Sequence, residues 1–165
     1  MNSVASRIRS PDAAASPHFA ALGAVLSVRD IAKASRFYQR VLGFDQRFTL
    51  SGADGELTLA VLGFGASTLL LGRLDELHYE HAVRARKIRR GPHGLGITMT
   101  LLVTDLDRVH KAARKAHAEI LLKPTEEFYG DLVFMFLDPD GYEWKVSQTL
   151  RQVSVDAIKE LVSRV

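Results

Sequence analysis

The chain has 165 residues, of which 47% are hydrophobic, and this is enough for one compact domain or for two half-domains fused around a common core. It contains no cysteine, which excludes a disulfide framework, thiolate metal ligands and a cysteine nucleophile, and which is typical of a cytoplasmic protein. The net charge of +3 is too small to predict a broad nucleic-acid-binding surface.

Residues 1–20 are rich in Ala and Ser and are predicted to form a flexible arm. No apolar run of about 7–15 residues follows Arg7 and Arg9, so a secretory signal is not expected. No stretch of the chain reaches the roughly 20 apolar residues that are needed to span a bilayer. We therefore expect a protein of the cytoplasm with no membrane partner.

Residues 21–72 are predicted to form a first unit with the order βαβββ. An apolar strand at 22–28 is followed by Asp30, a suitable helix N-cap, and the helix after it ends at Gly43. Its predicted apolar face consists of Ile31, Ala34, Phe37, Tyr38, Val41 and Leu42. Three strands are expected next, and turn-prone residues separate them. These strands are placed at about 44–50, 56–62 and 67–71.

Residues 94–148 are predicted to repeat this unit. A strand at 98–103 leads to the N-cap Asp105 and a helix at 106–117, whose inward residues are expected to be Val109, Ala112, Ala113 and Ala116. Strands follow at about 119–122, 131–137 and 142–147. The segment Val28-Arg29-Asp30-Ile31 recurs 75 residues later as Val103-Thr104-Asp105-Leu106, which indicates two copies of one unit.

Two further segments lie outside the units. Residues 73–93 form a charged connector that is predicted to be helical for part of its length. Its basic cluster at 84–90 follows several acidic residues and is interpreted as a solvated helix face; the alternative is a surface for an acidic partner. Residues 149–165 are predicted to contain a short amphipathic helix that docks on the body of the protein or on a second subunit.

Three segments resemble the glyoxalase, bleomycin-resistance and extradiol-dioxygenase superfamily, which has the vicinal oxygen chelate fold. They lie at 25–44, at 102–107 and at the closing hairpin Phe136-Leu137-Asp138-Pro139-Asp140-Gly141-Tyr142-Glu143-Trp144. The resemblance covers about residues 22–148. It implies an α+β fold in which two βαβββ modules form a curved eight-stranded mixed sheet around a cleft, often completed across a homodimer. It does not define a reaction, since the superfamily hosts several enzyme classes and pure drug-binding proteins.

Metal-dependent members of that superfamily carry a ligand early in the first strand of each module and a Glu late in each final strand. Carried onto this chain, these positions fall on Gly23, Thr98, Lys145 and a residue among 68–71. Glycine has no side chain to coordinate a metal, and a lysine ammonium repels a cation. The resemblance therefore predicts that the chain has no metal site and no cofactor, with a divalent metal as the alternative.

Because alternate residues of a strand face opposite sides, side chains in register with these positions are expected to line the cleft. Glu143 and Lys145 share one face. In one interpretation Glu143 is an acid or base and Lys145 is a cation that binds an anionic substrate; in the other, the two form an ion pair at a strand end. Tyr129 either stacks on a planar ligand or packs as an aromatic. The residues predicted to line the ligand-binding cleft are Ser27, Thr98, Thr100, Tyr129, Glu143 and Lys145.

The leading functional hypothesis is a metal-independent small-molecule-binding protein with an apolar cleft, acting as a homodimer. The rival is a metal-dependent lyase, isomerase or dioxygenase that uses ligands such as His93 and Glu143. A third hypothesis is a regulatory or interaction module that uses the connector and the C-terminal helix. The sequence assigns no catalytic residue and does not identify the ligand.

Overall fold

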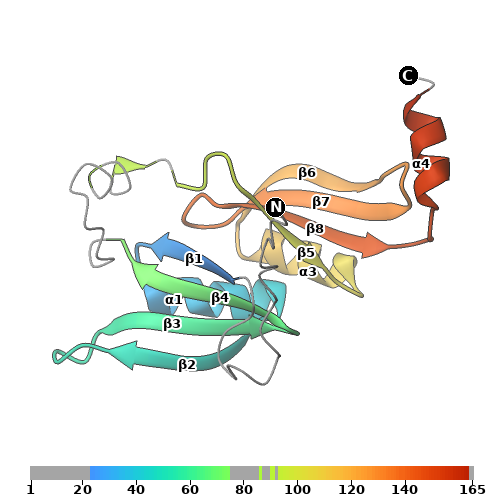
Figure 1. Ribbon diagram of the computed structural model, residues 1–165. Coiled ribbons are helices and arrows are strands. Elements are labelled where there is room, and N and C mark those ends of the chain that lie inside the picture. Colours follow the sequence, from blue (N-terminus) through green and yellow to red (C-terminus); the bar gives the residue numbers. More distant parts are fainter. Residues whose placement is uncertain (1–22, 75–85, 87–89, 92, 164–165) are drawn as a thin grey trace, which may run out of the picture.

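The structure is a computed structural model that describes residues 23–74, 86, 90–91 and 93–163 (Figure 1). The predicted arm at 1–20 and most of the connector at 73–93 lie outside the described residues. None of the described helices is long and apolar enough to cross a bilayer.

The first module has the predicted order βαβββ. It consists of β1 (Gly23–Val28), α1 (Ile31–Phe37) with a π-helical continuation η1 (Tyr38–Leu42), β2 (Asp45–Ser51), β3 (Leu57–Phe64) and β4 (Ser67–Arg73). The Asp30 carboxylate accepts a hydrogen bond of 2.9 Å from the backbone N–H of Lys33 and so caps α1. Gly43 ends the helical segment with a φ of 79°, a conformation that glycine adopts without a Cβ clash. The strand order is β1-β4-β3-β2, with β1 parallel to β4.

The second module repeats this arrangement. It consists of β5 (Thr98–Leu102), α3 (Leu106–Lys115), β6 (Glu119–Glu126), β7 (Asp131–Leu137) and β8 (Glu143–Thr149), in the order β5-β8-β7-β6. Asp105 caps α3 as Asp30 caps α1, because its carboxylate accepts from the backbone N–H of Arg108 at 3.0 Å. The predicted duplication of one α+β unit is therefore confirmed.

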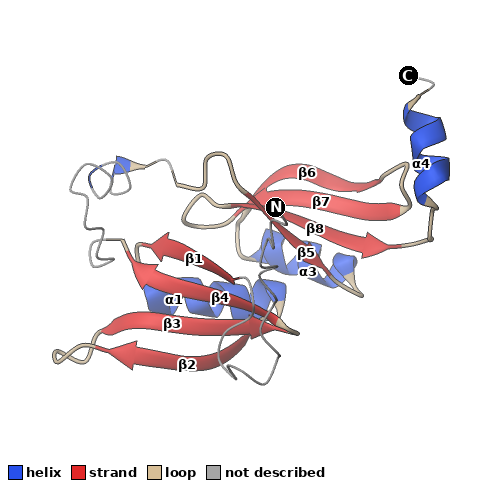
Figure 2. Cartoon of the chain, in the orientation of Figure 1, coloured by secondary structure: helices blue, strands red, loops and turns tan. Residues whose placement is uncertain are grey.

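The helices cover one face of each sheet and bring the modules together in one core. Figure 2 shows α3 beneath the second sheet, on the side of the first module. The Tyr38 ring lies 5.5 Å from the Trp144 ring, and Phe37 lies 6.2 Å from Phe136, both measured between ring centroids. Since Phe37 and Tyr38 belong to the first module and Phe136 and Trp144 to the second, the two halves share a single aromatic core.

The expected single eight-stranded sheet is instead two separate four-stranded sheets. In the described part of the chain, the outer edge of β1 is not extended by a strand of the second module. The hydroxyl of Tyr142 lies there instead: it accepts from the backbone N–H of Ser27 at 3.0 Å and donates to the Ser27 carbonyl at 3.1 Å. The closing hairpin thus provides, through one side chain, the hydrogen bonds that a neighbouring strand would have made.

Two details of the helices differ from the expectation. Ala116, predicted to face inward, is exposed because α3 ends at Lys115 and the chain turns at His117, which has a φ of 58°. The C-terminal helix α4 (Val155–Val162) lies at the far end of the second sheet in Figure 1. Its apolar residues Val155 and Val162 are 66% and 58% exposed, contrary to the expectation, whereas Ile158 is half-buried. Docking of this helix on the body or on a second subunit stays a prediction.

Candidate functional site

The helix-free face of each sheet, called the open face below, carries the side chains that the sequence assigned to ligand binding. In β1, Leu26 and Val28 are buried against the helix side, while Val25 on the open face is 56% exposed. In β8, Trp144 and Val146 are buried, and the residues that alternate with them, Glu143 and Lys145, are half-buried on the open face. Within the described residues, each sheet therefore has one face in the core and one face that no helix covers, although Val61 and Val133 on this second face are fully buried.

Strand register brings four of the six predicted site residues together on the second module, and a hydrogen bond adds a fifth. Thr98 pairs with Glu143 and Thr100 pairs with Lys145 between the parallel strands β5 and β8. Tyr129, in the loop before β7, contacts Lys145 from the same side. The sixth, Ser27, belongs to the first sheet, is only 5% exposed and forms backbone hydrogen bonds with Tyr142.

Of the two alternatives for Glu143 and Lys145, the ion pair is not formed within the described residues, where each side chain makes a separate contact. Glu143 accepts a hydrogen bond of 2.5 Å from the Thr98 hydroxyl, and the Lys145 ammonium donates to the Tyr129 hydroxyl at 3.0 Å. Residues two apart on a strand are separated by roughly 6.5 Å along the backbone, so cross-strand and loop neighbours are closer partners. Tyr129 also contacts Phe128 edge-on, with 5.3 Å between ring centroids.

The environment of Lys145 favours its charged form. Its hydrogen bond to Tyr129 raises the pKa of the ammonium, and the nearby carboxylates of Glu127 and Asp131 act in the same direction more weakly; desolvation opposes them. The ammonium also lies 5.4 Å from the centroid of the Tyr129 ring. The open face of the second sheet therefore presents a stable positive charge beside a phenol.

A second cluster, which sequence reasoning missed, joins the two modules behind this face. The buried carboxylate of Asp138 accepts from the Tyr38 hydroxyl at 2.5 Å and from the Trp144 indole N–H at 3.1 Å. Its other oxygen accepts from the backbone N–H groups of Asp140 and Tyr142. Burial raises the pKa of both Asp138 and Tyr38 above their usual values. The turn Asp138-Pro139-Asp140-Gly141 was recognised from the sequence, but its contact with a tyrosine 100 residues earlier leaves no local signal.

A cavity of about 680 Å³ lies beside this junction, between the closing hairpin, the end of α3 and the residues before β5. His93 lines it, with its ring 6.3 Å from the Tyr142 ring, while Glu143 is bonded to Thr98. Within the described residues, no three side chains of the His, Cys, Asp or Glu type converge to hold a metal ion. His93 and Glu143 thus do not form part of a described ligand cluster.

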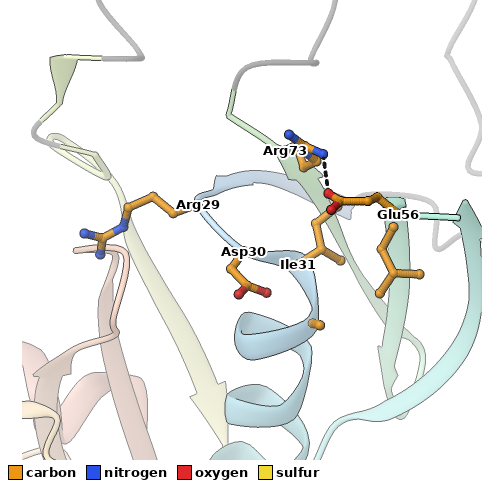
Figure 3. A pocket seen from close by; sticks show the side chains of 7 residues that line it. Arg29, Asp30, Ile31, Glu56 and Arg73 are labelled. Carbon is orange, nitrogen blue, oxygen red and sulfur yellow. Dashed lines mark hydrogen bonds and ion pairs between the residues drawn. The ribbon is translucent and has the colours of Figure 1, made fainter. Parts of the chain in front are cut away.

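A smaller cavity of about 390 Å³ opens at the start of α1 (Figure 3). Arg73 forms an ion pair with Glu56 at 2.9 Å across its mouth, and Arg29 extends away from that pair in the view. The Arg29 guanidinium instead binds Asp140 of the second module at 2.9 Å and the carbonyl of Pro139. Both arginines of this cavity are therefore engaged within the chain.

The positions that the resemblance assigns to metal ligands do not suit a divalent ion here. Thr98 pairs with Glu143 and Thr100 with Lys145, so the counterpart of Lys145 in the first module is Leu70, which pairs with Val25 two residues after Gly23. A set made of Gly23, Leu70, Thr98 and Lys145 lacks the imidazole and carboxylate donors that such ions require.

Comparisons with known proteins agree with this architecture. The sequence model of the family described as Glyoxalase/Bleomycin resistance protein/Dioxygenase superfamily matches residues 16–146. An uncharacterised protein of Mycobacterium bovis is 29% identical over 146 residues, which cover 87% of this chain and 92% of that protein.

Two solved structures illustrate the shared fold. TioX from Micromonospora sp. ML1 superposes with a TM-score of 0.63 at 21% identity, covering 78% of this chain and 98% of that one. A glyoxalase/bleomycin resistance protein/dioxygenase family enzyme from Burkholderia phytofirmans PsJN superposes with a TM-score of 0.59 at 20% identity, covering 77% and 96%. At this identity the likeness establishes the fold and leaves the chemistry to the residues.

Proposed function

Because the chain belongs to the glyoxalase/bleomycin resistance protein/dioxygenase superfamily, we propose that it binds a small molecule on the open faces of its sheets without a metal ion. The observation that carries this proposal is the set Gly23, Leu70, Thr98 and Lys145 at the positions that the resemblance assigns to metal ligands. A superfamily scaffold with this set keeps the binding surface and loses the ligands for Lewis-acid chemistry.

The exposed aliphatic side chains of the open faces support an apolar ligand. Val25, Leu50 and Leu102 are 56%, 52% and 62% exposed, and strand register places each of them on the face away from the helices. Across the first sheet, strand register joins Val25, Leu70, Val61 and Phe48 in one apolar row on this face. A continuous apolar row of this kind marks a site for a ligand or for another chain. The proposal includes both. A second copy of the chain covers these faces, and a ligand is held between the two copies. The protein acts in the cytoplasm.

The absence of metal chemistry is tested by elemental analysis of protein purified without a chelator or a metal-affinity tag. The proposal expects far less than one divalent ion per chain and no change in melting temperature on adding Ni²⁺, Zn²⁺, Mn²⁺ or Fe²⁺. About one tightly held ion per chain would overturn it and favour the rival, a metal-dependent lyase, isomerase or dioxygenase.

Binding and association are tested separately. The neutral fluorophore N-phenyl-1-naphthylamine should brighten on the wild-type protein with saturation, and sedimentation should show a dimer at micromolar concentration. Leu102→Glu places a charge on the open face and should dissociate the dimer, whereas Arg36→Glu on the exposed side of α1 should leave it intact. A monomeric wild type that does not bind the fluorophore would contradict the proposal.

A further inference from the structure

The open face of the second sheet contains a cation whose partner is not a carboxylate. Arg73 and Lys111 form ion pairs with Glu56 and Asp107, as surface cations commonly do. Lys145 is half-buried, and its side-chain hydrogen bond within the described residues goes to the Tyr129 hydroxyl. Lys145 therefore has donor capacity that its described partners do not use.

The geometry of this pair leaves only donors to face a ligand. The Lys145 ammonium has three N–H groups. One of them donates to the phenol oxygen of Tyr129, which acts as the acceptor. The phenol O–H is then turned away from Lys145, and the positive charge beside it strengthens it as a donor. Two donor atoms 3.0 Å apart are thus offered on the open face of the second sheet.

The neighbours on either side of Lys145 differ in polarity. Thr100 pairs with it on β5 and is exposed, whereas Met135 pairs with it on β7 and is half-buried. Glu143 is the nearest acidic side chain along the strand, and the Thr98 hydroxyl already binds it. Glu127 and Asp131 act on Lys145 through space more weakly than its hydrogen bond to Tyr129 does, and within the described residues neither forms an ion pair with it. An anionic group is therefore favoured at Lys145, and an apolar body is favoured over Met135.

We infer that Lys145, Tyr129 and Thr100 anchor an anionic oxygen group, a carboxylate or sulfonate, of a ligand whose apolar or aromatic body lies over Met135. This inference rests on the proposed function and specifies the ligand class for it. The two donors bind the two oxygens of the anion, and the Thr100 hydroxyl donates from the neighbouring strand.

Two matched fluorophores separate this inference from the proposed function. 1-Anilinonaphthalene-8-sulfonate carries an anion on the same aromatic body that N-phenyl-1-naphthylamine presents without charge. Lys145→Met should weaken binding of the sulfonate about tenfold or more, and leave binding of the neutral fluorophore within about twofold, because only the charge-assisted hydrogen bonds are removed. Tyr129→Phe should weaken the sulfonate by a smaller factor. Melting curves check that each variant is folded.

A charge-matched control lies on the other side of the same sheet. Lys115→Met removes one exposed positive charge at the end of α3 and should leave both affinities unchanged. If neither fluorophore binds the wild type, the proposed function itself fails. If both bind and Lys145→Met changes neither, or weakens both equally, the anchor is overturned while small-molecule binding stands.

Discussion

The two modules share one topology but differ on the face that their helices leave uncovered. At matching register positions the first sheet carries Val25 and Leu70 where the second carries Thr100 and Lys145, although the second sheet also carries Leu102 and Met135 on this face. The helix-covered faces are alike, since both consist of buried apolar side chains that meet in one core. Packing in the shared core therefore requires apolar side chains on one face of each module, whereas the side chains on the other face can differ between the modules.

The modules also differ in the turn that ends each sheet. The β7–β8 turn carries Asp138, Asp140 and Tyr142 into contact with the first module, while the β3–β4 turn consists of the exposed residues Gly65 and Ala66. The closing hairpin of the second module thus supplies hydrogen bonds between the two modules, and within the described residues the β3–β4 turn does not. We expect substitutions in that hairpin to have larger effects than equivalent changes in the first module.

The largest effect on folding is expected at Asp138. All four described partners of its carboxylate are donors, so Asp138→Asn places an NH₂ group against at least one of them. The free energy of unfolding should fall by about 3 kcal/mol, because a buried charge-assisted network is broken. Urea unfolding followed by the fluorescence of Trp144 measures the change. Asp107→Asn is the control: it breaks only an exposed ion pair with Lys111 and should cost less than about 0.5 kcal/mol.

The second prediction compares the two faces of one strand. Val28→Ala removes two methyl groups from a fully buried site and should lower the free energy of unfolding by about 2 kcal/mol. Val25→Ala makes the same chemical change on the open face of β1 and should cost less than about 0.5 kcal/mol in the monomer. Equal losses for both variants would show that the open face of the first sheet is as tightly packed as its core.

Much of the fold follows from local signals in the sequence. The caps Asp30 and Asp105, the stop at Gly43 and the repeat of one segment after 75 residues located the helices and their flanking strands. Period-2 alternation also placed Trp144 and Val146 on the buried side of β8. These features depend on neighbours within a few residues, which is why a single sequence reveals them.

The parts that were missed depend on distant residues. Nothing near Tyr142 in sequence indicates that its hydroxyl binds the backbone of Ser27 at the edge of β1. Likewise, Glu143 and Lys145 were placed on one face, but their partners Thr98 and Tyr129 follow from strand pairing and loop position. The identity of a ligand depends on such partners. The sequence therefore predicted which side chains lie on the open face, but not which contacts they make there.

The third prediction concerns that edge contact. Tyr142→Phe keeps the buried ring and removes the hydroxyl that binds both backbone groups of Ser27, so stability should fall by about 1 kcal/mol. Hydrogen exchange at the Ser27 amide should accelerate more than exchange at the centre of β3. Tyr129→Phe removes a hydroxyl from the open face and should change stability by less than about 0.5 kcal/mol. An unchanged Ser27 exchange rate in Tyr142→Phe would mean that the hydroxyl does not hold the edge of β1.

The smallest effect is expected from the ion pair that links the modules at the surface. The Arg29 side chain is 66% exposed and Asp140 is 8% exposed, so water screens the guanidinium even though its partner is sheltered. Arg29→Ala should therefore cost less than about 1 kcal/mol, since the backbone N–H of residue 29 still binds the Asp140 carboxylate. Asp140→Ala removes both contacts at once and should cost more than Arg29→Ala. If Arg29→Ala lowered the free energy of unfolding more than Asp140→Ala, the prediction would be wrong. The contact between the modules would then depend on the guanidinium and its hydrogen bond to the Pro139 carbonyl, and not on the Asp140 carboxylate.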